Sequence, residues 1–328
     1  MNTFGTLFQV TIYGESHQSS IGVVISGMPA GVKVDHNLIL EDLNKRKRSY
    51  PGITKRLEKD IYNITSGVFN DYTTGAPIHV AIENKDIKSE HYENIKNHPR
   101  PGHADFVSII KYKGFQDYRG GGFFSGRLTA ALVIAGSFAK MIIPYNISSE
   151  IKEVGGKTDL AEINDYLINL EKEKDSVGGI ITIKATNMDV GLGEPFFNKL
   201  DAKIAQIFFT IPAVKGVDFG LGFAGKTEKG SKYNEPLLNE FGKTKNNNDG
   251  GISGGISNGN DIVINAFIKP TPSIGIKQET FNLKENSIKP LEIIGRHDTA
   301  IIKRIGVVLE NALAIVLADF YLQLKAYK

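Results

Sequence analysis

The sequence predicts an α+β fold, because strand-like and helix-like segments are mixed along the chain without the regular alternation of a doubly wound sheet. Residues 128–143 and 299–325 are apolar over most of their length, which is typical of helices covered on several sides. Every second residue from 262 to 268 is isoleucine or alanine, which predicts a strand with one buried face. A chain of 328 residues can form one large domain or two ordinary ones.

The first part of the chain is expected to begin with strands at 7–13 and 22–26. A helix follows at 35–47, with Asp35 as its N-cap and Leu38, Leu40 and Leu43 on its inner side. Two further strand-like runs are predicted, and they span 60–68 and 77–83.

The second part is expected to be dominated by helices. The apolar helix 128–143 ends before Pro144, and another helix is predicted at 200–210. Strand 262–268 and the long helix 299–325 complete the pattern. Residues 226–251 are rich in lysine, asparagine and glycine, so we expect a long mobile loop that is either a disordered excursion or a lid or oligomer contact.

The composition predicts a packed globular protein and excludes several kinds of site. Apolar residues make up 41% and charged residues 23%. The net charge of +3 is too small to indicate a nucleic-acid partner. The absence of cysteine excludes disulfides, thiolate metal sites and cysteine nucleophiles, and no metal is expected. The N-terminus lacks the pattern of a signal peptide, and the apolar run 128–139 is too short to span a bilayer, so we expect a soluble, cytoplasmic protein without a membrane partner.

Arginine is scarce: of the 39 basic residues only eight are arginine. The few arginines are therefore expected where a planar, bidentate donor binds a carboxylate or phosphate. Several of them lie in segments that also carry glycine and histidine, and these segments are the candidates for chemistry.

Two short segments offer histidines that could transfer protons. Ser16 and His17 follow the first predicted strand, and a histidine beside polar groups can act as a general acid or base. In 100–105 (RPGHAD) a Pro-Gly turn presents His103 beside Arg100, which suits a phosphate ester. Each segment is also compatible with a structural histidine, held in the second case by Asp105.

The glycine-rich segment 119–127 (RGGGFFSGR) predicts an anion site. Glycines allow close approach of a ligand to the backbone, and the following helix offers amide donors. The spacing matches neither a Walker loop nor a dinucleotide fingerprint. Glycine runs before helices also occur without a ligand.

Four other segments have weaker signals. In 295–298 (GRHD), Asp298 is expected in the first turn of the last helix, where the helix dipole favours a carboxylate, although a plain cap is equally compatible. The segments 250–255 and 269–273 flank the strand 262–268 and could be a simple hinge and a simple turn. The basic run 45–48 closes the first helix and is also compatible with a solvated helix end.

In this order, these segments resemble the chorismate synthase family. The family's three signatures appear as GESHQSSIGVVISGMPAG, GGGFFSGRLTAALVIAGS and GRHDTAIIKRIGVVLENALAIVLADF, and RPGHAD and GGISGGISNG match as well. The resemblance runs from Phe4 to about Leu322. Gln18 replaces a usual glycine, Phe123-Phe124 replaces Arg-Ser or His-Phe, and Thr299 replaces a usual proline.

The resemblance implies a single domain over 1–328 with a β-α-β sandwich fold, in which long core helices lie between two antiparallel sheets. It implies a lyase that converts 5-enolpyruvylshikimate 3-phosphate to chorismate by 1,4-anti elimination, the last common step of the shikimate pathway to the aromatic amino acids. The reaction requires reduced FMN without net redox change. A homotetramer is also implied, with NADPH or an external flavin reductase as possible sources of reduced flavin.

The resemblance also assigns roles to residues. His103 would give a proton to the leaving phosphate, and His17 would act on the reduced flavin near N1. Asp298, supported by Ser16 and Ser125, would relay a proton through flavin N5. Substrate would be bound by arginines, namely Arg46, Arg48, Arg100, Arg127 and Arg296. FMN would be bound by Phe123, Phe124, Ser125, Ala213, Gly254, Lys269, Pro270, Thr271, Pro272, Ser273 and Arg296.

Two alternatives remain at this stage. A flavin oxidoreductase could use the same FMN site, and a non-catalytic module could retain the arginines to bind anions. His17, His103 and Asp298 are all present, which argues against a degenerate copy.

Overall fold

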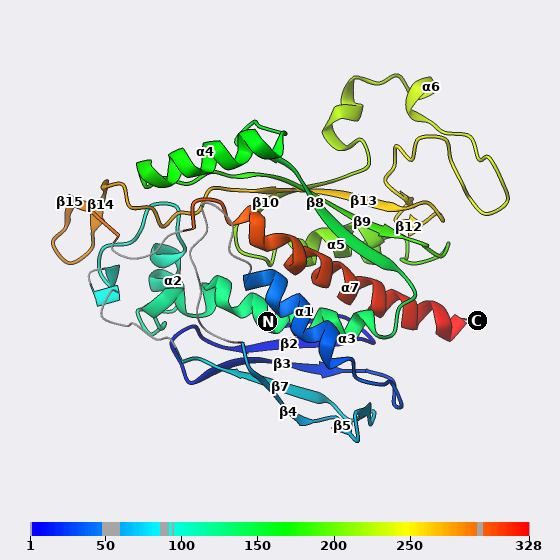
Figure 1. Ribbon diagram of the computed structural model, residues 1–328, viewed down its shortest axis with the longest axis horizontal. Helices are drawn as coiled ribbons and strands as arrows, with labels where there is room; N and C mark the ends of the chain where they lie inside the picture. The colour runs from blue at the N-terminus through cyan, green and yellow to red at the C-terminus, as the bar shows by residue number, and fades with distance from the viewer. Residues whose placement is uncertain (1, 48–59, 86–91, 94, 294–297, 328) are drawn as a thin grey trace.

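The computed structural model describes residues 2–47, 60–85, 92–93, 95–293 and 298–327, and it shows a helical layer between two antiparallel sheets (Figure 1). This arrangement confirms the α+β prediction and the expected sandwich. The first sheet has the order β1 (Thr3–Phe4), β2 (Gln9–Gly14), β3 (Ser20–Ser26), β7 (Ile78–Glu83) and β4 (Tyr62–Ser66). The second sheet has the order β10 (Val214–Phe219), β13 (Ile262–Ile268), β9 (Gly179–Thr186) and β8 (Asn146–Val154).

Period-two alternation gives each sheet one apolar face toward the helices. In β3, Ile21, Val23 and Ile25 are buried, and Val23 is paired with Val80 of β7. In the second sheet, Ile264 of β13 is buried opposite the buried Ile183 of β9. The apolar faces of the two sheets therefore pack against the helices from opposite sides and form one core with them.

The helical layer contains α1 (His36–Lys47), α3 (Thr129–Lys140), α5 (Leu200–Phe208) and α7 (Ile302–Tyr327). Helix α3 is buried without interruption from Ala130 to Ala139. It crosses α7 closely at Gly136, where an added Cβ would lie 2.3 Å from Cβ of Asn311. A larger residue at Gly136 would force the two central helices apart.

Helix α7 is long and apolar enough to pass a length and composition test for a membrane span, with a mean hydropathy of 1.8. Its apolar window is 83% buried by the rest of the protein. Packing in the helical layer therefore accounts for its hydropathy, as it does for core helices in general.

Smaller elements surround the sandwich. Helix α4 (Leu160–Glu173) covers the face of the second sheet that points away from α7 (Figure 1). Helix α2 (Asp105–Lys111) lies at one end of the molecule, near the hairpin of β14 (Gln278–Asn282) and β15 (Ser287–Leu291). Two short hairpins are formed by β5 (Val68–Phe69) with β6 (Tyr72–Thr73) and by β11 (Ile252–Ser253) with β12 (Ile256–Ser257).

The expected loop 226–251 extends away from the sandwich and contains the short helix α6 (Gly230–Tyr233) (Figure 1). Hydrogen bonds from side chains to the backbone, and not an apolar core, hold this loop in shape. The Glu235 carboxylate accepts hydrogen bonds from the backbone N–H groups of Asn246 and Asn248, and Asn239 Oδ1 accepts from those of Phe241 and Lys243.

Most predicted elements are found within a few residues of their expected bounds, with three corrections. Leu40 is 46% exposed, because the inner face of α1 follows the helical period through Ile39, Leu43 and Arg46. Helix α7 begins at Ile302, so Asp298 precedes the helix and is not in its first turn. The strands β8, β9 and β10 and helix α4 were not predicted.

Candidate active site

The glycine-rich segment forms an irregular turn, η2 (Arg119–Phe124), in front of the buried helix α3. Gly120, Gly121 and Gly122 have φ values of 59°, 81° and 53°, a conformation that side chains with a Cβ rarely adopt. The turn is followed by a short 3₁₀ helix, η3 (Gly126–Leu128), whose N-cap is Ser125. The Ser125 hydroxyl accepts a hydrogen bond of 3.3 Å from the Arg127 N–H, so this predicted proton-relay residue also shapes the turn.

Both predicted histidines face this turn. A Cβ added at Gly120 would lie 2.5 Å from His17 Nε2, and one added at Gly121 would lie 3.6 Å from His103 Nε2. The two imidazoles therefore approach neighbouring residues of the same backbone segment. Glycine is required at position 120, because any side chain would collide with His17 and Ser16.

His103 is held by a carboxylate in the turn before α2. Its Nδ1 lies 2.6 Å from Asp105 Oδ1, while Arg100 donates from Nε to Asp105 Oδ2 at 2.7 Å. Burial raises the pKa of Asp105, but hydrogen bonds from Arg100 and His103 outweigh it and hold that pKa well below its usual range. Arg100 Nη2 also lies 3.0 Å from His103 Nδ1, so Nδ1 is held by both groups and Nε2 points toward Gly121.

The His103 cluster is joined to the loop 269–273, which follows β13. Arg100 Nη1 donates to Ser273 Oγ at 3.0 Å, and Lys269 Nζ donates to the Gly102 carbonyl at 2.7 Å. Arg100, which was predicted to bind substrate, is 8% exposed, as is Arg127, and its guanidinium bonds to Asp105 and Ser273. These contacts place it between His103 and the loop 269–273.

A second cluster gathers cations around one buried carboxylate at the end of α1. Asp60 Oδ2 lies 3.5 Å from Arg46 Nη1 and 3.3 Å from Lys47 Nζ, and Asp60 Oδ1 is bonded by Arg127 Nη1. Burial raises the pKa of Asp60, but Arg46 and Arg127 outweigh it, so the pKa is lowered and the group is ionised. Among the described residues, three cations thus share one carboxylate.

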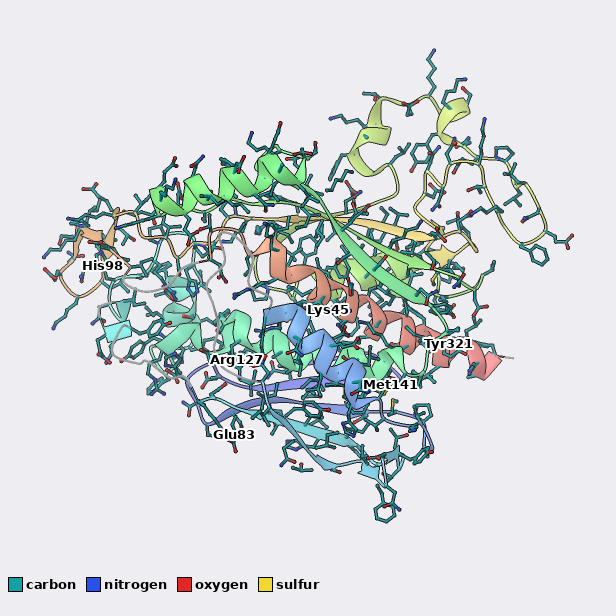
Figure 2. The ribbon with its side chains drawn as sticks, viewed as in Figure 1. Lys45, Glu83, His98, Arg127, Met141 and Tyr321 are labelled. Atoms are coloured by element: carbon teal, nitrogen blue, oxygen red, sulfur yellow. The ribbon has the colours of Figure 1, made fainter. Side chains whose placement is uncertain are left out.

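The guanidinium groups of this cluster are held firmly. Arg46 Nη2 donates to the Gly126 carbonyl at 2.9 Å, and Arg46 Nε donates to Thr129 Oγ1 at 2.9 Å. Figure 2 shows Arg127 between the helical layer and the end of β7 that carries Glu83, and Arg127 Nη2 donates to the Glu83 carbonyl at 3.4 Å. An anion bound here would meet a preorganised site.

The loop between β2 and β3 brings His17 to the same region. Asn84 connects this loop to Arg127, since its side chain bonds to Arg127 Nε and to the Glu15 and Gln18 carbonyls. Burial lowers the pKa of His17, and the Arg119 guanidinium lowers it further. Arg119 itself is paired in bidentate fashion with Asp117, at 2.8 and 2.7 Å.

Asp298 lies on the other side of Arg46. It accepts a hydrogen bond of 3.2 Å from Arg304 Nη1 in the first turn of α7. Arg46, Asp298 and Arg304 line one small cavity of about 50 Å³. Asp298 is thus close to the cationic cluster, although not through the helix-dipole geometry expected from the sequence.

The predicted flavin residues fall into two groups. Ala213 adopts a φ of 76°, and its carbonyl accepts a hydrogen bond of 2.9 Å from the Lys269 N–H, which joins it to the loop containing Pro270, Thr271 and Pro272. Gly254 is at the tip of the β11–β12 hairpin, at the opposite end of β13 from that loop, so the fold of one chain does not bring it to the other residues.

A cavity of about 580 Å³ opens beside His103. Phe123 and Phe124 contribute to its wall, and each is 37% exposed. Tyr112 and Phe115 line it as well, so the cavity presents aromatic surfaces next to a histidine. Such a lining suits a planar aromatic ligand.

Arg48 and Arg296 lie outside the described residues. Of the three departures from the family pattern, Gln18 donates to Asp117 Oδ2 at 3.0 Å, and buried Thr299 accepts from the Val177 N–H at 2.9 Å. The third, Phe123, lines the cavity beside His103.

Sequence reasoning missed several residues that hold the site together, namely Lys47, Asp60, Asn84 and Arg304. Asp60 and Asn84 are each more than 40 residues from Arg127 in sequence. No local pattern could have indicated these contacts. The basic run at the end of α1 was the only signal for Lys47.

Comparisons with known proteins show which family the chain is similar to. A family model described as chorismate synthase matches residues 8–322. Chorismate synthase of Chitinophaga pinensis is 48% identical over 98% of this chain and 97% of its own length. That of Pyrococcus abyssi is 44% identical over 97% of both chains. A crystal structure of chorismate synthase is similar with a TM-score of 0.75 at 26% identity, covering 98% of this chain and 93% of that one.

Proposed function

The chain belongs to the chorismate synthase family of lyases, and we propose that it converts 5-enolpyruvylshikimate 3-phosphate to chorismate with reduced FMN as cofactor. The observation that carries the proposal is the cationic cluster around Asp60, joined through Asn84 to the His17 loop. A substrate with one phosphate and two carboxylates needs excess positive charge, and its leaving phosphate needs a proton donor.

The residues expected to bind FMN fit a flavin. Thr271 Oγ1 is buried and, among the described residues, has no hydrogen-bond partner, so it is available to a polar ligand atom. Gly121 lets a ligand approach the backbone beside His103 and Ser125. The loop 269–273 would hold the cofactor together with Ala213, Phe123 and Phe124, and Gly254 and Arg296 remain proposals from the resemblance alone.

Substrate anions are proposed to bind to Arg46 and Arg127, with Lys47 adding charge and Asp60 fixing the spacing of the cations. Arg48 and Arg296 are proposed for the same role from the resemblance. Loss of phosphate breaks the C3–O bond, and loss of hydrogen from C6 completes the new double bond. The phosphate leaves with the electron pair of the C3–O bond and C6 loses its hydrogen as a proton; reduced FMN, when bound, would supply electron density to the substrate ring and a base for that proton.

The contacts support an exchange of the two histidine roles expected from the sequence. His103 is connected to the proposed flavin loop through Arg100 and Lys269. His17 is connected to the phosphate-binding Arg127 through Asn84. We therefore assign proton donation to the leaving phosphate to His17, whose lowered pKa would be raised by the negative charge of a bound phosphate, and hydrogen bonding to the flavin to His103. Asp298, beside Arg46, remains the proposed proton relay with Ser16 and Ser125 in support.

Flavin affinity separates the two assignments. His103→Ala should raise the Kd of reduced FMN about 10-fold, or ~1.4 kcal/mol, because a hydrogen bond to the ring is lost. His17→Ala should leave that Kd within about 2-fold while turnover falls by at least ~100-fold. Anaerobic fluorescence titration measures the affinity. The reverse pattern would support the roles expected from the sequence.

The function itself is tested anaerobically with purified protein, photoreduced FMN and 5-enolpyruvylshikimate 3-phosphate. Chorismate absorbance and phosphate release should rise together and only with reduced flavin. A folded, FMN-binding protein that yields neither product would overturn the proposal.

A second arm replaces photoreduced FMN by oxidised FMN and NADPH. Product in this arm would show that the chain reduces its own flavin, and its absence would assign that step to an external flavin reductase.

Assembly as a homotetramer and a soluble, cytoplasmic location are further proposals from the family resemblance. Light scattering tests the homotetramer.

A further inference from the structure

Asn84, the residue directly after β7, connects two parts of the site through one side chain. Its Oδ1 accepts a hydrogen bond of 3.1 Å from Arg127 Nε. Its Nδ2 donates to the carbonyl of Glu15 at 3.0 Å and to that of Gln18 at 2.9 Å. The carbonyls flank His17 in the sequence, so Asn84 contacts both ends of the turn that presents this imidazole.

The orientation of the Asn84 amide is determined by these partners. Arg127 Nε is only a donor, and the two backbone carbonyls are only acceptors. If the amide were rotated by half a turn, its nitrogen would face a donor and its oxygen would face two acceptors. Asparagine is therefore suited to this position, because it combines one acceptor and two donors in a short side chain.

The His17 loop has other contacts as well: the Gln18 N–H donates to the Glu15 carbonyl at 3.2 Å, the Asn84 N–H donates to the Ser19 carbonyl at 3.0 Å, and the His17 ring meets the Tyr92 ring edge-on with centroids 5.0 Å apart. The Ser16 N–H donates to the Gly122 carbonyl at 3.3 Å, and Gln18 Nε2 donates to Asp117 Oδ2 at 3.0 Å. The first of these two contacts reaches the glycine-rich segment, and the second reaches Asp117 just before it. Asn84 joins the loop to the Arg127 guanidinium.

We propose that Asn84 is a positioning residue for the lyase reaction, and that it sets the His17 imidazole against the Arg127 guanidinium. Asn84 then fixes the distance between the Arg127 guanidinium, which binds the phosphate, and the His17 imidazole, which protonates it. A displacement of about 1 Å between such groups can lower turnover about 100-fold. The inference rests on the proposed function for its kinetic readout.

A double-mutant cycle tests whether Asn84 acts through His17. Asn84→Ala in the otherwise native chain should lower kcat about 10- to 100-fold. In the His17→Ala background the same change should lower kcat by less than about 2-fold, since no imidazole remains to be positioned. KM should rise in both backgrounds, because Arg127 loses its acceptor in both.

Asn63 supplies the matched control. It is an exposed asparagine on β4 of the same sheet, and Asn63→Ala should leave kcat and KM unchanged. Equal losses of kcat from Asn84→Ala in the two backgrounds would overturn the proposal, since a general structural defect acts independently of His17. Asn84→Ser, which keeps a smaller polar side chain, carries the same cycle if the alanine variant does not fold.

Hydrogen exchange separates this inference from the proposed function. Amides of residues 15–19 should exchange faster in Asn84→Ala than in the native chain, with no change in the buried core of α3. If the native protein makes no chorismate, the lyase proposal fails while this measurement still decides whether Asn84 holds the loop. Unchanged exchange at 15–19 would overturn the positioning role whatever the activity.

Discussion

Asp42 of α1 and Asp60, which pairs with Arg46 and Lys47 at the end of α1, are both buried carboxylates, yet they differ in the groups around them. Asp42 accepts from Lys140 Nζ at 2.7 Å and from two neutral groups, Asn311 Nδ2 at 3.1 Å and Ser137 Oγ at 3.3 Å, which connects three helices of the central layer. Asp60 is surrounded by three cations of the described residues. At Asp42 the hydrogen-bond donors stabilise a buried carboxylate. At Asp60 the carboxylate holds three cationic side chains close together.

Burial and ion pairing alone therefore do not identify a functional carboxylate. Both groups have a lowered pKa, because nearby cations outweigh burial at each. Asp60 differs in having three cations among the described residues, against two at Asp42, and in its connection through Arg127 and Asn84 to the loop of His17. We therefore expect changes at Asp42 to act on stability and changes around Asp60 to act on substrate binding.

The largest effect is expected from Asp42→Ala. Removal of this carboxylate leaves Lys140 and Asn311 buried without their acceptor, which typically costs about 3–5 kcal/mol. The free energy of unfolding, measured by urea denaturation, should fall by this amount, while KM of the folded fraction stays unchanged. A loss below about 1 kcal/mol would contradict a structural role for Asp42.

Lys45 provides the control at the same cluster. Its side chain is 44% exposed and lies 3.4 Å from Asp42. Lys45→Gln should therefore change the free energy of unfolding by no more than about 0.5 kcal/mol, since an exposed ion pair contributes little.

A smaller effect is expected from Arg127→Lys at the other cluster. Lysine keeps the charge but loses the planar fork that bonds Asp60, Asn84 and an anion together. KM for the phosphorylated substrate should rise at least about 10-fold, equivalent to ~1.4 kcal/mol. Initial-rate kinetics at saturating reduced FMN measures this change.

The opposite exchange at the Asp42 cluster is the matched comparison. Lys140→Arg exchanges lysine for arginine beside Asp42, away from the proposed substrate site. KM should therefore stay unchanged. A rise in KM for both variants would show that the two clusters are not functionally distinct, and an unaltered KM for Arg127→Lys would remove Arg127 from the substrate site.

Local periodicity predicted much of the fold. Strand β13 and helices α1, α3 and α7 follow their apolar periods closely enough to be found from the sequence. Strand β9 has the same alternation as β13 and was within reach of the same rule, whereas β8 alternates isoleucine with serine and glutamate over an edge strand and gives a weaker signal.

The site was predictable where a residue lies in a motif and not where its role depends on distant contacts. His17, His103 and Arg127 were identified because glycines and turn residues surround them in the sequence. Asp60 precedes a strand in an ordinary charged stretch, and its contact with Arg127 spans 67 residues. The engagement of Arg100 by Asp105 and Ser273 likewise appears only when the loops 100–105 and 269–273 come together.

The smallest expected effect concerns pH and phosphate. At both Asp42 and Asp60 the folded pKa is lower than the unfolded value of about 3.9, so each contributes stability that is present above that value and is lost as the pH falls through the folded pKa. Asp42→Asn and Asp60→Asn should each weaken the dependence of unfolding free energy on pH in this acidic range. This measurement alone does not separate the two clusters.

Phosphate at pH 7 separates them. Asp60→Asn removes the negative charge among three cations, so inorganic phosphate at 10 times its Kd should stabilise this variant by about 1.4 kcal/mol, more than it stabilises the native chain. Asp42→Asn should gain nothing beyond the native response, because Lys140 lies against the helical layer and Lys45 is an exposed surface cation. Urea denaturation with phosphate against chloride at equal ionic strength measures both. Equal responses of the two variants would mean that the Asp60 cluster is a structural ion-pair network like that of Asp42, and the proposed substrate site would then have to lie elsewhere along the glycine-rich segment.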